Sequence, residues 1–168
     1  LSRSNVDKEV FGADLGQRLS MLIHQTEGDP QTWVAGCSHG RFVDKAHALR
    51  SLYPENTYLY FILGYDTLLR LFNPKYYTDM IGELNSLFEA CYILVANRDE
   101  NGLKEMRDIL SQPNYRPYAD RIYFINLPES FKSLSSTVVR KKRMHGQTIS
   151  ELVPPRIAEA IEILDLYK

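Results

Sequence analysis

The 168-residue chain has few features that could cross-link it covalently or anchor it in a membrane. Its two cysteines, Cys37 and Cys91, are too few and too far apart for a disulfide framework or a metal cluster, which favours a reducing compartment. The longest apolar run, near "YLYFILGY", is far shorter than the ~20 residues that span a bilayer. No charged-then-apolar signal segment opens the sequence. We therefore expect a cytoplasmic or nuclear protein without a membrane partner.

An excess of one charge sign is also absent. The formal net charge is −1, so the chain as a whole has no electrostatic attraction to nucleic acid, and any anion site must be local. The 11 tyrosines fall inside predicted strands and helices, which does not suit an RNA-stacking platform. We expect no nucleic-acid partner. Hydrophobic residues make up 44% of the chain, enough for a core, and the length predicts one domain over residues 1–168.

Apolar and aromatic periodicity predicts alternating strands and helices. The predicted strands are residues 32–37, 57–63, 91–96 and 121–127. The predicted helices are residues 11–26, 42–53, 66–72, 76–90, 100–112, 135–145 and 155–167. The apolar segments "TYLYFILG" and "CYILVAN" are typical of buried strands. This alternation predicts an α/β fold, with a parallel sheet and helices on both of its faces.

In such a sheet, ligands bind at the carboxyl ends of the strands. One of these ends leads into "LSSTVVRKKR", in which Ser135, Ser136 and Thr137 precede a basic helix. Backbone N–H groups and the positive end of the helix dipole can hold phosphate there, and Arg140 lies within one turn. A guanidinium binds phosphate oxygens at two points. The stretch predicts a polyphosphate site. An ordinary capped surface helix, or a basic localisation patch, remains the alternative.

Three further strand ends carry polar residues. Gly64 would allow a ligand to approach the backbone, and Asp66 could accept a hydrogen bond from a ribose or an amide. The alternative for Asp66 is a helix N-cap. Arg98 could reach a phosphate, although a surface salt bridge is the more ordinary role, and a loop histidine such as His39 commonly has no role.

Several motifs resemble the nicotinamide mononucleotide adenylyltransferases. "LSSTVVR…GQTISELVPPRIAEAI" looks like the closing motif of that family, and "FILGYDTLLRLFNPKYY" resembles its Gly-x-Asp segment. "ILVANRD" resembles the family strand that ends in arginine, and "NVDK" resembles its lysine-bearing loop. The segments "GYDTLLRLFNPKYY" and "GRFVDKA" resemble most those of a divergent fungal branch of this family. The resemblance covers nearly the whole chain, but its closing motif is shared with other nucleotidyltransferases.

The resemblance implies a Rossmann-like nucleotidyltransferase fold. It implies transfer of AMP from ATP to nicotinamide or nicotinate mononucleotide, with Mg²⁺ as cofactor and NAD and pyrophosphate as products. The mononucleotide phosphate attacks the α-phosphorus directly, so catalysis is mainly positioning and charge stabilisation. The alternatives are another phosphorylated acceptor, or a nucleotide-binding protein without turnover that serves as an interaction module. Homo-oligomerisation is left open.

Site residues follow from the matched positions. The ATP phosphates are expected at Ser136, Thr137, Val138, Val139 and Arg140. The mononucleotide is expected at Lys8, Gly64, Asp66, Tyr76, Tyr77 and Arg98. The two sets are expected to form one site, and the strand end at Gly64 and the family match imply that Tyr76 or Tyr77 lies near Asp66. Tyrosine faces stack on flat rings, which favours an acceptor with a flat aromatic base.

One part of the family pattern is absent. The family opens with a strand and a Gly-x-Phe-x-Pro-x-His-x-Gly-His turn, and no such motif occurs in these 168 residues. A missing central strand would leave an unpaired sheet edge, which proteins generally avoid. We therefore expect the sequence to be incomplete at its N-terminus, with no catalytic residue assigned within it.

Overall fold

The computed structural model describes residues 1–2, 12–97 and 100–168, with only the backbone of residues 97 and 100–103 described. These residues form two compact units, which are described separately below. The sheet unit is Phe42–Ser133, and the helical unit combines Leu1–Arg41 with Leu134–Lys168. The expectation of a single domain remains a prediction.

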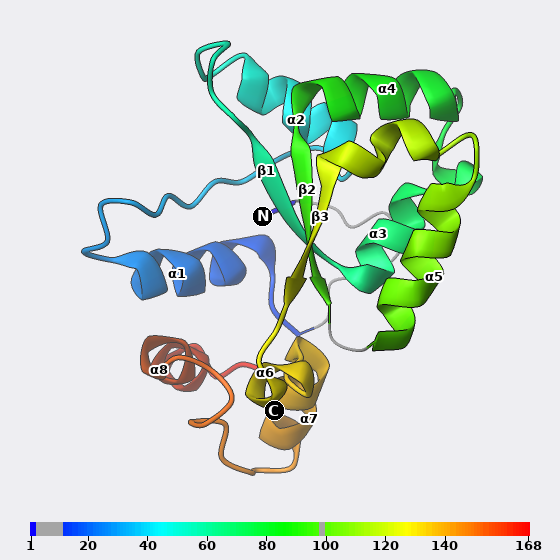
Figure 1. Cartoon of the computed structure of the whole chain (residues 1–168). Helices are drawn as coiled ribbons and strands as arrows, with labels where there is room; N and C mark the ends of the chain where they lie inside the picture. Colours follow the sequence, from blue (N-terminus) through cyan, green and yellow to red (C-terminus); the bar gives the residue numbers. More distant parts are fainter. Residues whose placement is uncertain (3–11, 98–99) are drawn as a thin grey trace. The chain divides into compact units, whose positions relative to one another are not determined.

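The sheet unit contains a three-stranded parallel sheet in the order β1-β2-β3, flanked by helices (Figure 1). In chain order its elements are α2 (Phe42–Arg50), β1 (Tyr60–Gly64), α3 (Tyr65–Leu71), η1 (Pro74–Tyr76), α4 (Met80–Ala90), β2 (Tyr92–Asn97), α5 (Glu100–Ser111), η2 (Arg116–Arg121), β3 (Ile122–Asn126) and α6 (Glu129–Lys132). The predicted α/β class is therefore confirmed, together with three of the four predicted strands.

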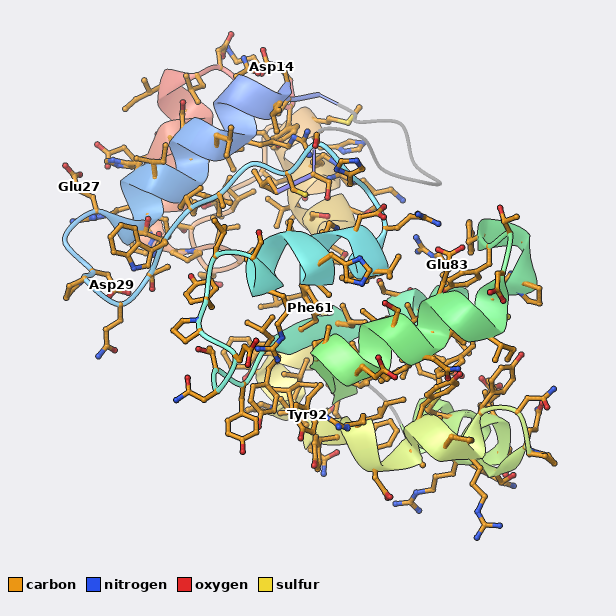
Figure 2. The ribbon with its side chains drawn as sticks, turned by 90° about the horizontal axis from the view of Figure 1, so that it is seen from above. Asp14, Glu27, Asp29, Phe61, Glu83 and Tyr92 are labelled. Atoms are coloured by element: carbon orange, nitrogen blue, oxygen red, sulfur yellow. The ribbon has the colours of Figure 1, made fainter. Side chains whose placement is uncertain are left out.

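The strand register places the core residues of the sheet on one face. Leu63 of β1 lies beside Val95 of β2, which lies beside Phe124 of β3. Leu63 and Val95 are 5% and 0% exposed, because α2, α3, α4 and α5 contribute side chains to the core on this side of the sheet. Beneath α2, the Phe61 ring meets the Phe42 ring edge-on at 5.4 Å between centroids (Figure 2). Side-chain alternation along each strand thus sets which residues enter the core.

The opposite face of the sheet carries large exposed side chains. Tyr60 and Ile62 of β1 are 50% and 71% exposed, and Tyr123 of β3 is 49% exposed. Tyr60 stacks on Tyr92 at 5.1 Å between ring centroids. The expectation that β1 is a buried strand is therefore wrong. Its aromatic and β-branched residues alternate between a buried and an exposed face, and composition alone does not separate these two cases.

The strand predicted at residues 32–37 is also wrong. This segment lies in the helical unit and has no regular structure except one isolated parallel bridge between Cys37 and Ser2. Trp33 is 87% exposed. A strand is stabilised by cross-strand pairs, and along this segment only Cys37 has a bridge partner among the described residues.

The helical unit contains α1 (Leu15–Thr26), α7 (Ser136–Met144) and α8 (Pro155–Ile163). Its core consists of Ala13, Met21, Val139, Ile149, Ala160, Ile161 and Leu166. A capping box begins α1: Asp14 Oδ1 accepts from the Gln17 amide at 2.8 Å, and Gln17 Oε1 accepts from the Asp14 amide at 2.9 Å. This cap explains why α1 begins at Leu15, four residues later than predicted.

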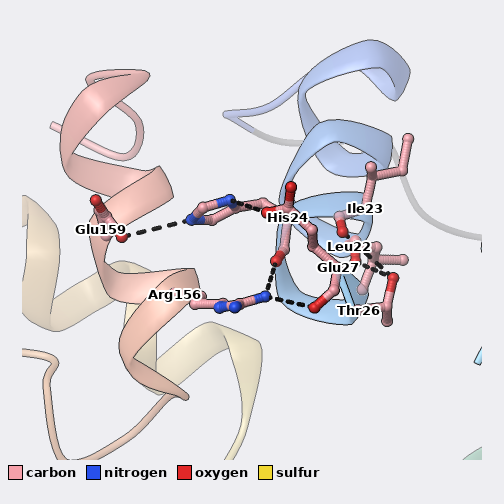
Figure 3. A network of polar contacts seen from close by, with 7 residues as sticks. All are labelled: Leu22, Ile23, His24, Thr26, Glu27, Arg156 and Glu159. Atoms are coloured by element: carbon pink, nitrogen blue, oxygen red, sulfur yellow. Dashed lines mark hydrogen bonds and ion pairs between the residues drawn. The ribbon is translucent and has the colours of Figure 1, made fainter. Parts of the chain in front are cut away.

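The C-terminal end of α1 is hydrogen-bonded to α8. Arg156 Nη1 donates to the carbonyl oxygens of His24 and Glu27 at 3.0 and 2.8 Å (Figure 3). His24 Nε2 lies 3.4 Å from Glu159 Oε2. The last carbonyls of a helix have no intrahelical donor, so Arg156 supplies donors that the helix itself lacks.

Across the described ranges, no helix is long and apolar enough to cross a membrane.

Candidate functional site

The predicted phosphate site lies at the start of α7. Ser135 is the N-cap, in an extended conformation, and its Oγ accepts from the Val138 amide at 3.2 Å. The first intrahelical bond runs from the Val139 amide to the Ser135 carbonyl at 3.1 Å. The sequence offered three neighbouring hydroxyls and could not distinguish which one caps the helix. The structure assigns that role to Ser135.

This cap divides the amide donors of the first turn into two sets. Those of Val138 and Val139 are already bonded, whereas those of Ser136 and Thr137 precede the first intrahelical bond and point out of the helix end. Both residues are exposed. Two amide groups and two hydroxyls are therefore available to a ligand, and the helix dipole adds partial positive charge at the same place.

Arg140 lies beside these groups. Its Nη2 donates to Thr137 Oγ1 at 3.4 Å, so the guanidinium is directed back toward the first turn. The contact is long for a hydrogen bond, which leaves the guanidinium able to turn to another acceptor. Thr137 and Arg140 are brought together as the sequence predicted.

The two valines have different surroundings. Val139 is 7% exposed and belongs to the core of the helical unit, whereas Val138 is 36% exposed. Neither side chain carries a polar group. Any role of these residues at a phosphate would fall to the backbone, and their amides are engaged in the cap.

The remaining basic residues of this stretch lie at the other end of α7. Lys141, Lys142 and Arg143 occupy its last turn, where positive charge complements the negative end of the helix dipole. The Lys141 and Lys142 side chains are exposed. Gly146, at φ +66°, closes the helix, and the Gln147 amide donates to the Lys142 carbonyl at 2.9 Å. Helix termination is therefore a sufficient structural reason for this basic run.

The predicted mononucleotide residues Gly64 and Asp66 lie where β1 passes into α3. Gly64 ends β1 and is the N-cap of α3, and a Cβ placed on it would meet no atom within 4 Å. Asp66 lies in the first turn of α3, is exposed, and has no hydrogen bond or ion pair with the described residues. Asp66 is thus not the N-cap, which was the alternative reading. Its carboxylate is accessible to a donor on a ligand.

The two tyrosines have different surroundings. Tyr77 packs on the core of the sheet unit, and its hydroxyl donates to the Leu71 carbonyl at 2.6 Å. Leu71 ends α3, five residues after Asp66, which corresponds to about 7.5 Å along a helix. Tyr76 is half-buried, with Lys75 Nζ 4.5 Å from its ring centroid. The Tyr77 hydroxyl thus stabilises the C-terminal end of α3, whereas Asp66 lies in its first turn.

Two predicted residues, Lys8 and Arg98, lie outside the described residues. The α7 group belongs to the helical unit and the Gly64–Asp66 group to the sheet unit. The expectation that they form one site remains a prediction.

The chain has sequence relatives with named activities. A protein of Schizosaccharomyces pombe named "Putative nicotinamide mononucleotide adenylyltransferase" is 27% identical over 188 residues, which cover 100% of this chain and 74% of that protein. A "Probable nicotinate-nucleotide adenylyltransferase" of Thermoanaerobacter sp. is 27% identical, over 75% of this chain and 55% of that protein. One of the same name from Shewanella woodyi is 31% identical, over 67% and 54%. The predicted resemblance is confirmed.

The chain is thus related to the nicotinamide- and nicotinate-nucleotide adenylyltransferases, at 27–31% identity to these three. It spans about half the length of the two bacterial relatives. No family model matches the chain. The similarity to the fungal protein extends over the whole chain, so it includes both the α7 group and the Gly64–Asp66 group.

Proposed function

We propose that this chain binds the substrates of an enzyme that transfers AMP from ATP to nicotinamide or nicotinate mononucleotide, forming NAD or its deamido form and pyrophosphate. The names of its relatives support this reaction class, and the parallel α/β sheet is a fold suited to nucleotides. The observation that carries the proposal is the start of α7. Two unbonded amides, two hydroxyls and an arginine meet there at the positive end of a helix.

In this proposal the β- and γ-phosphates of ATP lie at the start of α7. The amides and hydroxyls of Ser136 and Thr137 donate to phosphate oxygens, and Arg140 leaves Thr137 to pair with them. Because the Val138 and Val139 amides are engaged, Ser136 and Thr137 carry the backbone contribution. Asp66 accepts from a hydroxyl or amide of the mononucleotide, and Gly64 admits the ligand close to the backbone.

Transfer then depends on charge and position rather than on an enzyme nucleophile. Arg140 and the start of α7 stabilise the negative charge that develops on the departing pyrophosphate, which lowers the free energy of the transition state. A bound mononucleotide phosphate attacks the α-phosphorus without diffusing to it.

The described residues hold no group of three or more histidine, cysteine, aspartate or glutamate side chains that could bind a metal. The proposed Mg²⁺ is therefore assigned to the phosphates of ATP, which commonly supply its ligands together with water.

Titration of the intact protein with ATP and Mg²⁺ at fixed salt tests the phosphate site. Arg140→Ala should weaken ATP binding about ten- to a hundredfold, the effect of one lost charge-assisted hydrogen bond. Arg140→Lys should recover only part of it, because lysine lacks the two-point fork. Lys141→Ala and Lys142→Ala are matched controls. They should change the affinity for ATP less than twofold, because ion pairs of exposed side chains contribute little free energy. Equal losses at all three positions would indicate a diffuse basic patch.

A turnover assay separates the reaction from nucleotide binding alone. The intact protein with ATP and Mg²⁺ is offered nicotinamide mononucleotide, nicotinate mononucleotide and phosphopantetheine in turn, and dinucleotide and pyrophosphate are measured. Formation of NAD or its deamido form supports the proposal. ATP binding without any product would favour a nucleotide-binding interaction module.

The proposed cytoplasmic or nuclear location can be tested by fluorescence microscopy of the tagged protein.

A further inference from the structure

A groove lies in the sheet unit, between α5, η2 and the first half of β3. Its volume is about 440 Å³, within the range of roughly 300–1,000 Å³ that is usual for small-molecule sites. Its apolar lining comes from Leu110, Ala119, Ile122 and Phe124. Ile122 begins β3, so the groove lies toward the amino end of this strand, away from the carboxyl end of the sheet where Gly64 ends β1.

Two arginines line the same groove from different elements. Arg107 comes from α5 and Arg116 from η2. Both side chains are exposed, and neither guanidinium has a hydrogen bond or ion pair within the described parts of the chain. Two guanidinium groups thus lie beside a shared apolar surface, although the whole chain is close to neutral.

We propose that this groove binds a small organic anion with an apolar body. The apolar body would cover Leu110, Ile122 and Phe124, and the anionic head would pair with Arg107 and Arg116. Guanidinium suits this role because it is weakly hydrated and presents several donors in one plane to a carboxylate, sulfonate or phosphate. The proposal rests on the groove itself and uses no step of the proposed nucleotidyl transfer.

Anilinonaphthalene sulfonate is a suitable probe, since it joins an apolar ring system to one anionic group and fluoresces when it leaves water. Titration of the intact protein should show a saturable site. Arg107→Glu and Arg116→Glu should each raise its dissociation constant about tenfold or more, because each removes a charge-assisted contact and adds a repulsive charge. Lys142→Glu is the matched control, with the same charge change on an exposed side chain of α7, and should change it less than twofold.

A second variant tests the location without changing charge. Ser111 is an exposed residue that lines the groove at the end of α5. Ser111→Trp should fill the space and abolish saturable binding, while far-UV circular dichroism and the melting temperature stay at wild-type values. The proposal is overturned if the dye binds the Arg107→Glu and Arg116→Glu variants as tightly as the wild type, or if folded Ser111→Trp protein binds it unchanged.

Competition then defines the ligand chemistry. Octanoate should displace the dye. Octanol and octylamine lack the anionic head, so they lose one charge-assisted hydrogen bond and should displace the dye at least tenfold less well. Inorganic phosphate lacks the apolar chain, so it should also be at least tenfold weaker. Equal displacement by octylamine would identify a merely apolar surface, and equal displacement by phosphate would show that the apolar body contributes nothing. Either result would contradict the proposal.

Discussion

The sheet unit and the helical unit differ in the depth of their cores. In the sheet unit, Leu68, Leu84 and Ile93 are 0% exposed, because a sheet face and several helices enclose them. In the core of the helical unit, the least exposed residue is Ile161, at 2%. The comparison indicates that apolar burial contributes more to the sheet unit, whereas polar contacts such as the Arg156 cap contribute a larger share to the helical unit.

The largest expected effect comes from truncating each core. Leu84→Ala should lower the free energy of unfolding by about 2–5 kcal/mol, since it leaves a cavity in a fully enclosed site. Val139→Ala should cost about 1–3 kcal/mol, because it removes less apolar volume from a site that is 7% exposed. Urea denaturation followed by far-UV circular dichroism measures both.

The matched control for Leu84 lies on the same helix. Ile81 is 46% exposed, so Ile81→Ala should cost less than about 1 kcal/mol. A cost for Val139→Ala as large as that for Leu84→Ala would contradict the proposed difference between the two cores.

The sequence predicted the sheet unit more accurately than the helical unit, and the reason is physical. "YILVAN" and "IYFIN" form strands as predicted, because each has a parallel neighbour in register. Residues 32–37 have similar β-branched and aromatic content, but among the described residues their one bridge partner is Ser2, opposite Cys37. Strand propensity is realised only where a partner strand is present, and a single sequence does not show where that partner lies.

The candidate site was also predictable only in part. The hydroxyl run and Arg140 were placed correctly at a helix start, because capping preferences and helical spacing are local properties of the chain. That Ser135 is the cap depends on one backbone conformation, which three neighbouring hydroxyls do not reveal. The Arg107 and Arg116 groove was missed, because its residues come from two elements and carry no motif.

Cys91 offers a pH test of the deeper core. Burial raises the pKa of its thiol to about 11, and the thiol also donates to the Leu87 carbonyl at 3.3 Å. Because the folded state holds this proton more tightly than the unfolded chain, the stability is fully present below pH 9 and is lost as the pH rises toward 11. Unfolding free energies across this window should fall by about 1–3 kcal/mol.

The same measurement on Cys91→Ala isolates this contribution, since other groups also titrate above pH 9. The wild-type decline should exceed that of the variant, and Cys37→Ala should follow the wild type because Cys37 is only partly buried. Iodoacetamide at pH 8 should modify Cys37 before Cys91 in folded protein. Equal alkylation rates would mean that the core of the sheet unit opens readily, which would contradict its proposed depth.

The smallest expected effect tests the polar contribution to the helical unit. Arg156→Ala removes the Nη1 group that donates to two of the last carbonyls of α1, but both carbonyls are near solvent and water can replace the arginine. We therefore expect a loss of about 1 kcal/mol, as for an ordinary hydrogen bond. Arg156→Lys should recover part of it, because an ammonium can donate to a carbonyl but is a compact and more strongly hydrated group than a guanidinium.

Glu159→Gln is the matched control on α8. Its partner His24 lies 3.4 Å away, and both side chains are well exposed, so this substitution should change the stability by less than about 0.5 kcal/mol. Thermal melts of the three variants should therefore rank Arg156→Ala below Arg156→Lys, with Glu159→Gln close to wild type. If Glu159→Gln were the most damaging, the ion pair rather than the carbonyl cap would join α1 to α8. A loss of several kcal/mol for Arg156→Ala would instead mean that this cap outweighs the small apolar core of the helical unit.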